Sequence, residues 1–282
     1  MSEFFAALTD PDIPFLRYAV VVGLLASIPF GISGTFVVAR RISYIAGAIA
    51  HCALGGIGAA LYLQYRFQLE HVESLPLCGA VAQALLAAVV IGMVSLYGRQ
   101  REDTVIGAVW AIGMAQGLIL IAKTPGYIDP MSYLFGRIVI VSRGDLWAAG
   151  ILSVLVTGLS LLFYNKLVAV CFDEELARLR GVCVECYYLL LLCLTAITVV
   201  LLVTIVGIVM VIALLTLPPA VAGQFSRSIW QMMVGSVLLC MAFTTSGLAV
   251  SYTYDLPSGP AIILIGGLAY LLVVLLGRFR KA

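Results

Sequence analysis

Charged residues are scarce in this chain. Of its 282 residues, 11% are Asp, Glu, Lys or Arg and 63% are hydrophobic. A soluble domain usually carries about a quarter charged residues, so this composition excludes an ordinary soluble protein. The apolar runs are continuous and about twenty residues long, which is typical of transmembrane helices, whereas a barrel would show segments of roughly ten alternating residues. The sequence therefore predicts an all-α polytopic membrane bundle forming a single domain over residues 1–282.

The chain also lacks the motifs of common catalytic classes. No G-x-x-x-x-G-K-[ST] phosphate loop occurs, so we do not expect the chain to hydrolyse ATP itself. No H-E-x-x-H or G-x-S-x-G motif is present, and the basic residues lie singly or in pairs, which gives no support for a nucleic-acid partner. Cys183-x-x-Cys186 is a weak zinc signal without a second pair. These absences predict a non-enzymatic protein with no permanently bound cofactor.

The apolar segments predict eight or nine transmembrane spans. The count depends on residues 187–223, which are too long for one ordinary span and which we interpret as two short or re-entrant segments broken near Gly207. In the fourth span, Gly113-x-x-x-Gly117 offers a flat face for close helix contact. The other predicted spans are residues 15–39, 42–65, 77–97, 104–122, 146–164, 229–252 and 261–276.

The basic residues predict the orientation of the chain. If Arg40 and Arg41 are cytoplasmic, alternation places eleven basic residues inside and five near the outside, a clear positive-inside bias. The protein is then a multi-pass inner-membrane protein surrounded by lipid, with an external N-terminus and a cytoplasmic C-terminus.

His51 is the leading candidate for function, because it is the only histidine in an apolar segment. Ionisable side chains at membrane depth are costly and usually face a bundle interior or a water-filled cavity. Its neighbours one helical turn away, Gly47, Ala48 and Gly55, are small. They allow either close helix packing or room for a hydrated ion beside the imidazole. The alternative is a neutral histidine hydrogen-bonded to a carbonyl group of a neighbouring helix.

Two further regions carry candidate residues. Glu70, His71 and Glu73 form an external loop of metal-compatible types, and Asp255 lies in a second external loop, although such residues can simply be solvated. Residues 172–181 are too polar to cross a bilayer and predict a short helix on the cytoplasmic side. This helix is either an ordinary interfacial helix or a docking element for a cytoplasmic partner. Its candidate docking residues are Phe172, Asp173, Glu174, Glu175, Leu176, Ala177 and Gly181.

Six stretches together resemble the permease subunits of the zinc/manganese/iron ABC importer family. In order along the chain they are residues 36–41, 50–51, 134–146, 172–177, 207–220 and 255–260. The resemblance implies a homodimeric permease that accepts a divalent metal ion from an extracytoplasmic binding protein. It also implies a separate cytoplasmic ABC ATPase, docked on the helix at 172–181, and a place for His51 on the metal path.

The sequence departs from that family at Gly47. Members typically carry an aspartate four residues before the histidine, and they carry Leu-Pro-Gly where this chain has Leu54-Gly55-Gly56. Losing a carboxylate removes a hard anionic ligand, which should weaken Mn(II) binding more than Zn(II) or Fe(II) binding. Two alternatives stay open at this point, a permease for a metal chelate and a secondary carrier that needs no ATPase.

Overall fold

The computed structural model describes residues 14–68, 74–98, 101–125 and 143–279, and within these ranges all regular structure is helical. The helices follow one another along the chain with short connections. Their bounds are α2 Pro14–Ala39, α3 Tyr44–Phe67, α4 Leu75–Tyr97, α5 Glu102–Ala122, α7 Arg143–Leu162, α8 Tyr164–Phe172, α9 Glu174–Leu179, α10 Val184–Val206, α11 Ile208–Phe225, α12 Ile229–Tyr254 and α13 Ser258–Phe279.

The described helices include nine that are long and apolar enough to cross a membrane. The predicted break falls at Gly207, which separates α10 from α11 with φ +84°, a backbone conformation that favours glycine. The two helices are 23 and 18 residues long, so they are not the short segments that the sequence suggested. Of the eight or nine spans predicted, the structure therefore supports nine.

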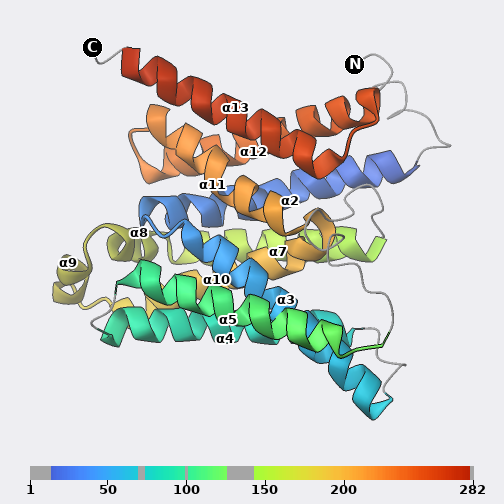
Figure 1. Cartoon of the computed structure of the whole chain (residues 1–282). Coiled ribbons are helices and arrows are strands. Elements are labelled where there is room, and N and C mark those ends of the chain that lie inside the picture. Colours follow the sequence, from blue (N-terminus) through green and yellow to red (C-terminus); the bar gives the residue numbers. More distant parts are fainter. Residues whose placement is uncertain (1–13, 69–73, 99–100, 126–142, 280–282) are drawn as a thin grey trace.

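The helices form three groups (Figure 1). Helices α3, α4 and α5 pack against one another on one side, and α11, α12 and α13 pack against one another on the other. Between them lie α2, which contacts α7, α11 and α12, and α10, which contacts α2, α3 and α4. The C-terminal ends of α2 and α13 lie at the same end of the bundle as α9.

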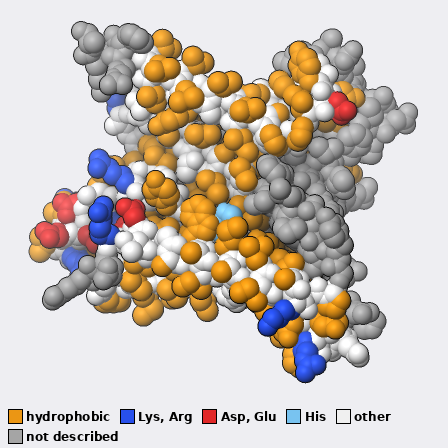
Figure 2. All heavy atoms as spheres, in the orientation of Figure 1, with side chains coloured by type: hydrophobic (Ala, Val, Ile, Leu, Met, Phe, Trp, Pro, Cys, Tyr) orange, Lys and Arg blue, Asp and Glu red, His pale blue; other side chains and the backbone are white. Residues whose placement is uncertain are grey.

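Charge is segregated on this fold. In Figure 2, hydrophobic side chains cover the length of the helices, and charged side chains gather at their ends, most densely around α9. Exposed leucines such as Leu264, Leu268 and Leu272 lie along α13, where lipid tails can cover them at no cost in hydration. The surface pattern is that of a protein embedded in a bilayer.

Glycine carbonyls and α-carbons make the contacts around α3. A β-carbon on Gly55 would lie 2.7 Å from the carbonyl oxygen of Gly113, and one on Gly117 would lie 2.9 Å from the amide nitrogen of Gly55. The prediction that Gly113-x-x-x-Gly117 forms a flat contact face is therefore confirmed, and its partner is α3. Gly56 and Gly79 bring α3 and α4 even closer, since a β-carbon on Gly56 would lie 2.1 Å from the carbonyl oxygen of Gly79.

The predicted cytoplasmic stretch divides into two helices. Residues up to Phe172 belong to α8, and Asp173 then caps the six-residue α9 by accepting a hydrogen bond from the amide of Leu176 at 2.9 Å. The prediction of a single helix over residues 172–181 is therefore wrong at its start. The aspartate interrupts it, because its side chain satisfies the free N–H groups of a new helix.

Candidate functional site

His51 lies inside the bundle on α3 and is 9% exposed. Its imidazole stacks on the indole of Trp110 from α5, with ring centroids 4.9 Å apart and ring planes inclined by 18°. On the face shown in Figure 2, a histidine side chain is visible among hydrophobic ones, and His51 is the only histidine among the described residues. The ring is therefore covered on one side by an aromatic plane and is almost fully buried.

The Nδ1 atom of His51 is buried and has no hydrogen-bond partner among the described residues. A buried polar atom without a partner costs about 1–3 kcal/mol, so native proteins usually satisfy it or use it. The alternative in which Nδ1 is bonded to the carbonyl of a neighbouring described helix is not what the structure shows. A neutral imidazole nitrogen of this kind is the commonest metal ligand in proteins.

The space beside Gly47 is filled. A β-carbon on Gly47 would lie 2.8 Å from Cζ3 and 2.9 Å from Cη2 of Trp110, closer than real side chains approach. Both glycines next to His51 therefore allow close packing. Gly47 packs against the aromatic ring of Trp110, and Gly55 packs against the backbone of α5. The room for a hydrated ion that the sequence left open is not found at Gly47.

Sequence reasoning missed Trp110, although one signal was available. Trp147 and Trp230 stand at the starts of predicted spans, where tryptophan commonly anchors a helix in the interface. Trp110 instead lies near the middle of its span. A mid-span tryptophan needs a packing partner, but the sequence does not reveal that the partner is His51.

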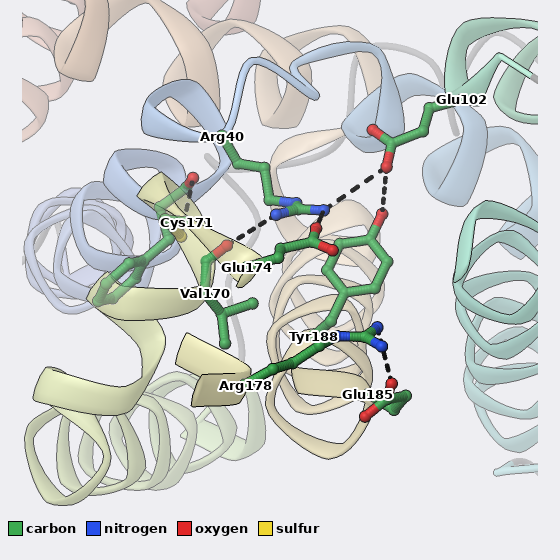
Figure 3. A network of polar contacts seen from close by, with 9 residues as sticks. Arg40, Glu102, Val170, Cys171, Glu174, Arg178, Glu185 and Tyr188 are labelled. Carbon is green, nitrogen blue, oxygen red and sulfur yellow. Dashed lines mark hydrogen bonds and ion pairs between the residues drawn. The ribbon is translucent and has the colours of Figure 1, made fainter. Parts of the chain in front are cut away.

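Arg40, directly after α2, ties four elements together (Figure 3). Its Nη1 donates a hydrogen bond of 2.7 Å to the carbonyl oxygen of Val170 in α8, and its Nη2 donates to the carboxylate of Glu174 in α9. The same Nη2 lies 3.6 Å from Glu102 at the start of α5. The guanidinium carbon stands 4.3 Å from the ring centroid of Tyr188 in α10, whose hydroxyl lies 3.4 Å from Glu102. We name this cluster, Arg40, Glu102, Val170, Glu174 and Tyr188, the Arg40 hub.

The surroundings of Arg40 favour the charged form of its guanidinium group. Burial by itself would lower the pKa of Arg40, but the hydrogen bond and the charge of Glu174, with smaller effects of Tyr188 and Glu102, raise that pKa above its ordinary value. The sequence had identified Arg40 as a topological marker. Its partners lie up to 148 positions away, and no local pattern indicates them.

The α9 helix presents apolar side chains outward beside its charges. Leu176 and Leu179 are 43% and 85% exposed, Phe172 is also exposed, and Glu175 is exposed next to them, whereas Ala177 is buried. Arg178 pairs with Glu185 at 2.8 Å, which fixes the end of α9 to the start of α10. The turn at Gly181 has φ +74°, a conformation that glycine allows.

The remaining candidates are not gathered into one site. Glu70, His71 and Glu73 lie outside the described residues. Asp255 ends α12 at an exposed position in the left-handed conformation. Among residues 14–68, 74–98, 101–125 and 143–279, no group of three or more His, Cys, Asp or Glu side chains could hold a metal ion. Within these ranges His51 is therefore not part of a cluster of three or more potential metal ligands.

The apolar spans, the charged end around α9 and the lone buried imidazole define a multi-pass membrane protein of the transport class. The chain matches the ABC 3 transport family over residues 12–277, and it belongs to that family. It is therefore an ABC permease subunit, a transport component without catalysis of its own, as the sequence predicted.

Relatives match along nearly their whole length. A probable metal transport system membrane protein of Chlamydia pneumoniae is 39% identical over 89% of this chain and 85% of that protein. The manganese transport system membrane protein MntC of Listeria monocytogenes is 31% identical, with 93% and 90% covered. In the solved structure of PsaBC from Streptococcus pneumoniae in complex with Fab, one chain superposes with a TM-score of 0.81 at 27% identity, covering 96% of this chain and 94% of that one.

Proposed function

We propose that this permease conducts divalent transition-metal ions, Zn, Mn or Fe, into the cell, and that His51 is a transit ligand on the path. The observation that carries the proposal is the buried, unpartnered Nδ1 atom of His51 in a membrane-embedded helix. The Chlamydia and Listeria relatives, named for the transport of metal and of manganese, support it. A single neutral nitrogen binds an ion weakly, which suits a site that the ion must leave.

The proposed partners follow from the ABC permease class. An ABC ATPase would supply the energy and dock on α9, where Leu176 and Leu179 offer apolar contacts. An extracytoplasmic binding protein would deliver the metal at the opposite end, where Asp255 lies and the 70–73 loop is predicted. Two copies of the chain would form the channel, and the His51 of the second copy would supply a second imidazole, with water in the remaining coordination positions. Membership in an ABC family favours this system over the ATPase-independent carrier.

Replacing His51 with alanine is expected to reduce uptake of radioactive Zn²⁺ or Mn²⁺ at least about tenfold, because the only described imidazole ligand is lost. Cells that express His51→Ala would be compared with cells that express Cys78→Ala at equal membrane levels. Cys78 is exposed in the first turn of α4, away from His51, so its variant should transport normally. Equal uptake by both variants would remove His51 from the mechanism. Addition of a chelator at equal total metal separates free-ion uptake from chelate uptake.

The cysteines provide a test of the proposed orientation. In single-cysteine variants, a membrane-impermeant maleimide should label Cys78 in intact cells and exposed Cys183 only after the membrane is opened. Cys171 should resist in both cases, because burial raises its pKa to about 12, although the charge of Arg40 offsets part of this effect. At pH 8 a thiol of that pKa is about one part in ten thousand thiolate, the reactive form. Labelling of Cys183 in intact cells would reverse the proposed orientation.

A further inference from the structure

Gly47, His51 and Trp110 form one unit at the contact between α3 and α5. Residues 47 and 51 are four positions apart on α3 and therefore lie on the same face of the helix. The indole of Trp110 covers both, since it stacks on the imidazole and occupies the place of a side chain at position 47. The indole of Trp110 thus determines which side chains α3 can offer to an ion at positions 47 and 51.

Contacts one turn further along α5 hold the indole in this place. A β-carbon on Gly113 would lie 2.5 Å from Sγ and 2.9 Å from Cα of Cys52, so α5 touches α3 directly beside His51. The thiol of Cys52 also donates to the carbonyl oxygen of Val109, at 3.3 Å. Because Val109 precedes Trp110, the backbone that carries the indole is fixed to the helix that carries the imidazole. The stack is therefore built into the α3–α5 contact.

We propose that Trp110 is the specificity-determining residue of the transport path, a proposal that rests on His51 being a transit ligand. The indole fills the place that a ligand side chain at position 47 would need, so these two positions of α3 offer an ion the imidazole nitrogen of His51 and no oxygen. Imidazole suits Zn(II) and Fe(II), whereas Mn(II) prefers carboxylate and water oxygens. The unit formed by Gly47, His51 and Trp110 therefore selects ions that accept an imidazole nitrogen and do not need a carboxylate oxygen from α3.

Steric exclusion makes a prediction about pairs of substitutions. Gly47→Ala alone should lower the melting temperature of the purified protein, because the new methyl group meets the indole at 2.8 Å. In the Trp110→Ala background the same Gly47→Ala change meets no indole, so it should lower the melting temperature less there than it does in the parent chain. Gly150→Ala on α7, where a β-carbon meets nothing within 4 Å, is the matched control and should melt like the parent.

The selectivity test places a carboxylate beside His51. Gly47→Asp, Trp110→Ala and the double variant are purified, and the binding of Mn²⁺ and Zn²⁺ is measured by equilibrium dialysis. The double variant has room for both groups on one face and should gain about tenfold in Mn²⁺ affinity relative to Zn²⁺. Gly47→Asp alone should not gain, because the indole still occupies the site. An equal gain without the tryptophan substitution, or no gain in the double variant, overturns the role of Trp110.

The same measurements separate this inference from the proposed function. Addition of His51→Ala to the parent should abolish Zn²⁺ binding. If that loss occurs while the Gly47 and Trp110 variants keep the parental Mn²⁺ to Zn²⁺ ratio, Trp110 is not the specificity-determining residue and His51 remains a ligand. If His51→Ala binds Zn²⁺ like the parent, the transit-ligand proposal itself fails, and the inference fails with it.

Discussion

The Arg40→Gln variant is expected to lose nearly all metal uptake while still reaching the membrane. Arg40 is the only described cation that bridges the carboxylates of Glu102 in α5 and Glu174 in α9. Without it, two negative charges face each other at the junction of the bundle and α9, and they repel. Removal of one partner from a buried ion pair costs about 3–5 kcal/mol, but these carboxylates are 35% and 34% exposed, so about 1–3 kcal/mol is expected here.

We expect this loss of stability to weaken the connection between α9 and the transmembrane helices rather than to unfold the protein. If an ATPase docks on α9, its motion reaches the transmembrane helices through Glu174, Arg40 and Glu102, so the variant should hydrolyse ATP without moving metal. ATPase activity and ion uptake would be measured together in proteoliposomes that contain the complete complex. Arg41→Gln is the matched control, since Arg41 is adjacent and exposed. Identical coupling in the Arg40 and Arg41 variants would contradict a role of the Arg40 hub.

Replacement of Gly56 with valine is expected to abolish the folded protein. A β-carbon at Gly56 would lie 2.1 Å from the carbonyl oxygen of Gly79 and 2.8 Å from Cβ of Gln83. The conflict is with backbone on the facing helix, so no flexible side chain can move away, and α3 and α4 must separate. Overpacking costs about 1–3 kcal/mol where side chains can shift and more where, as here, two backbones must separate, and an ordinary domain is stable by only about 5–15 kcal/mol.

The measurement for Gly56→Val is the yield of monodisperse protein from membranes by size-exclusion chromatography, with its melting temperature. Gly107→Val is the control, because a β-carbon on Gly107 of α5 meets nothing within 4 Å. We expect the Gly107 variant to behave like the parent and the Gly56 variant to be recovered at a few per cent or as aggregate. A normal yield and melting temperature for Gly56→Val would show that α3 and α4 are not in backbone contact.

Local sequence signals predicted the membrane helices well because their causes are local. Span length, the break at Gly207 and the flat face of Gly113 and Gly117 each follow from a few consecutive residues. The stacking of Trp110 on His51 depends instead on which two helices pair and in which register. The Arg40 hub depends on three separate connections that return the chain to one point. Contacts of this kind depend on how the helices pack together, and they cannot be predicted from the local pattern of one sequence.

The backbone contact between α3 and α5 also bears on time scales. Gly55, Gly113 and Gly117 bring the backbones of the two helices into direct contact, so His51 and Trp110 travel together whenever the bundle rearranges. The stack then opens by rotation of a side chain, the half-buried indole or the imidazole, about its own bonds. Rotamer changes of exposed side chains take picoseconds to nanoseconds, whereas helix motions in transport take microseconds to milliseconds. Even if burial slows it considerably, uncovering of the imidazole need not set the pace of the transport cycle.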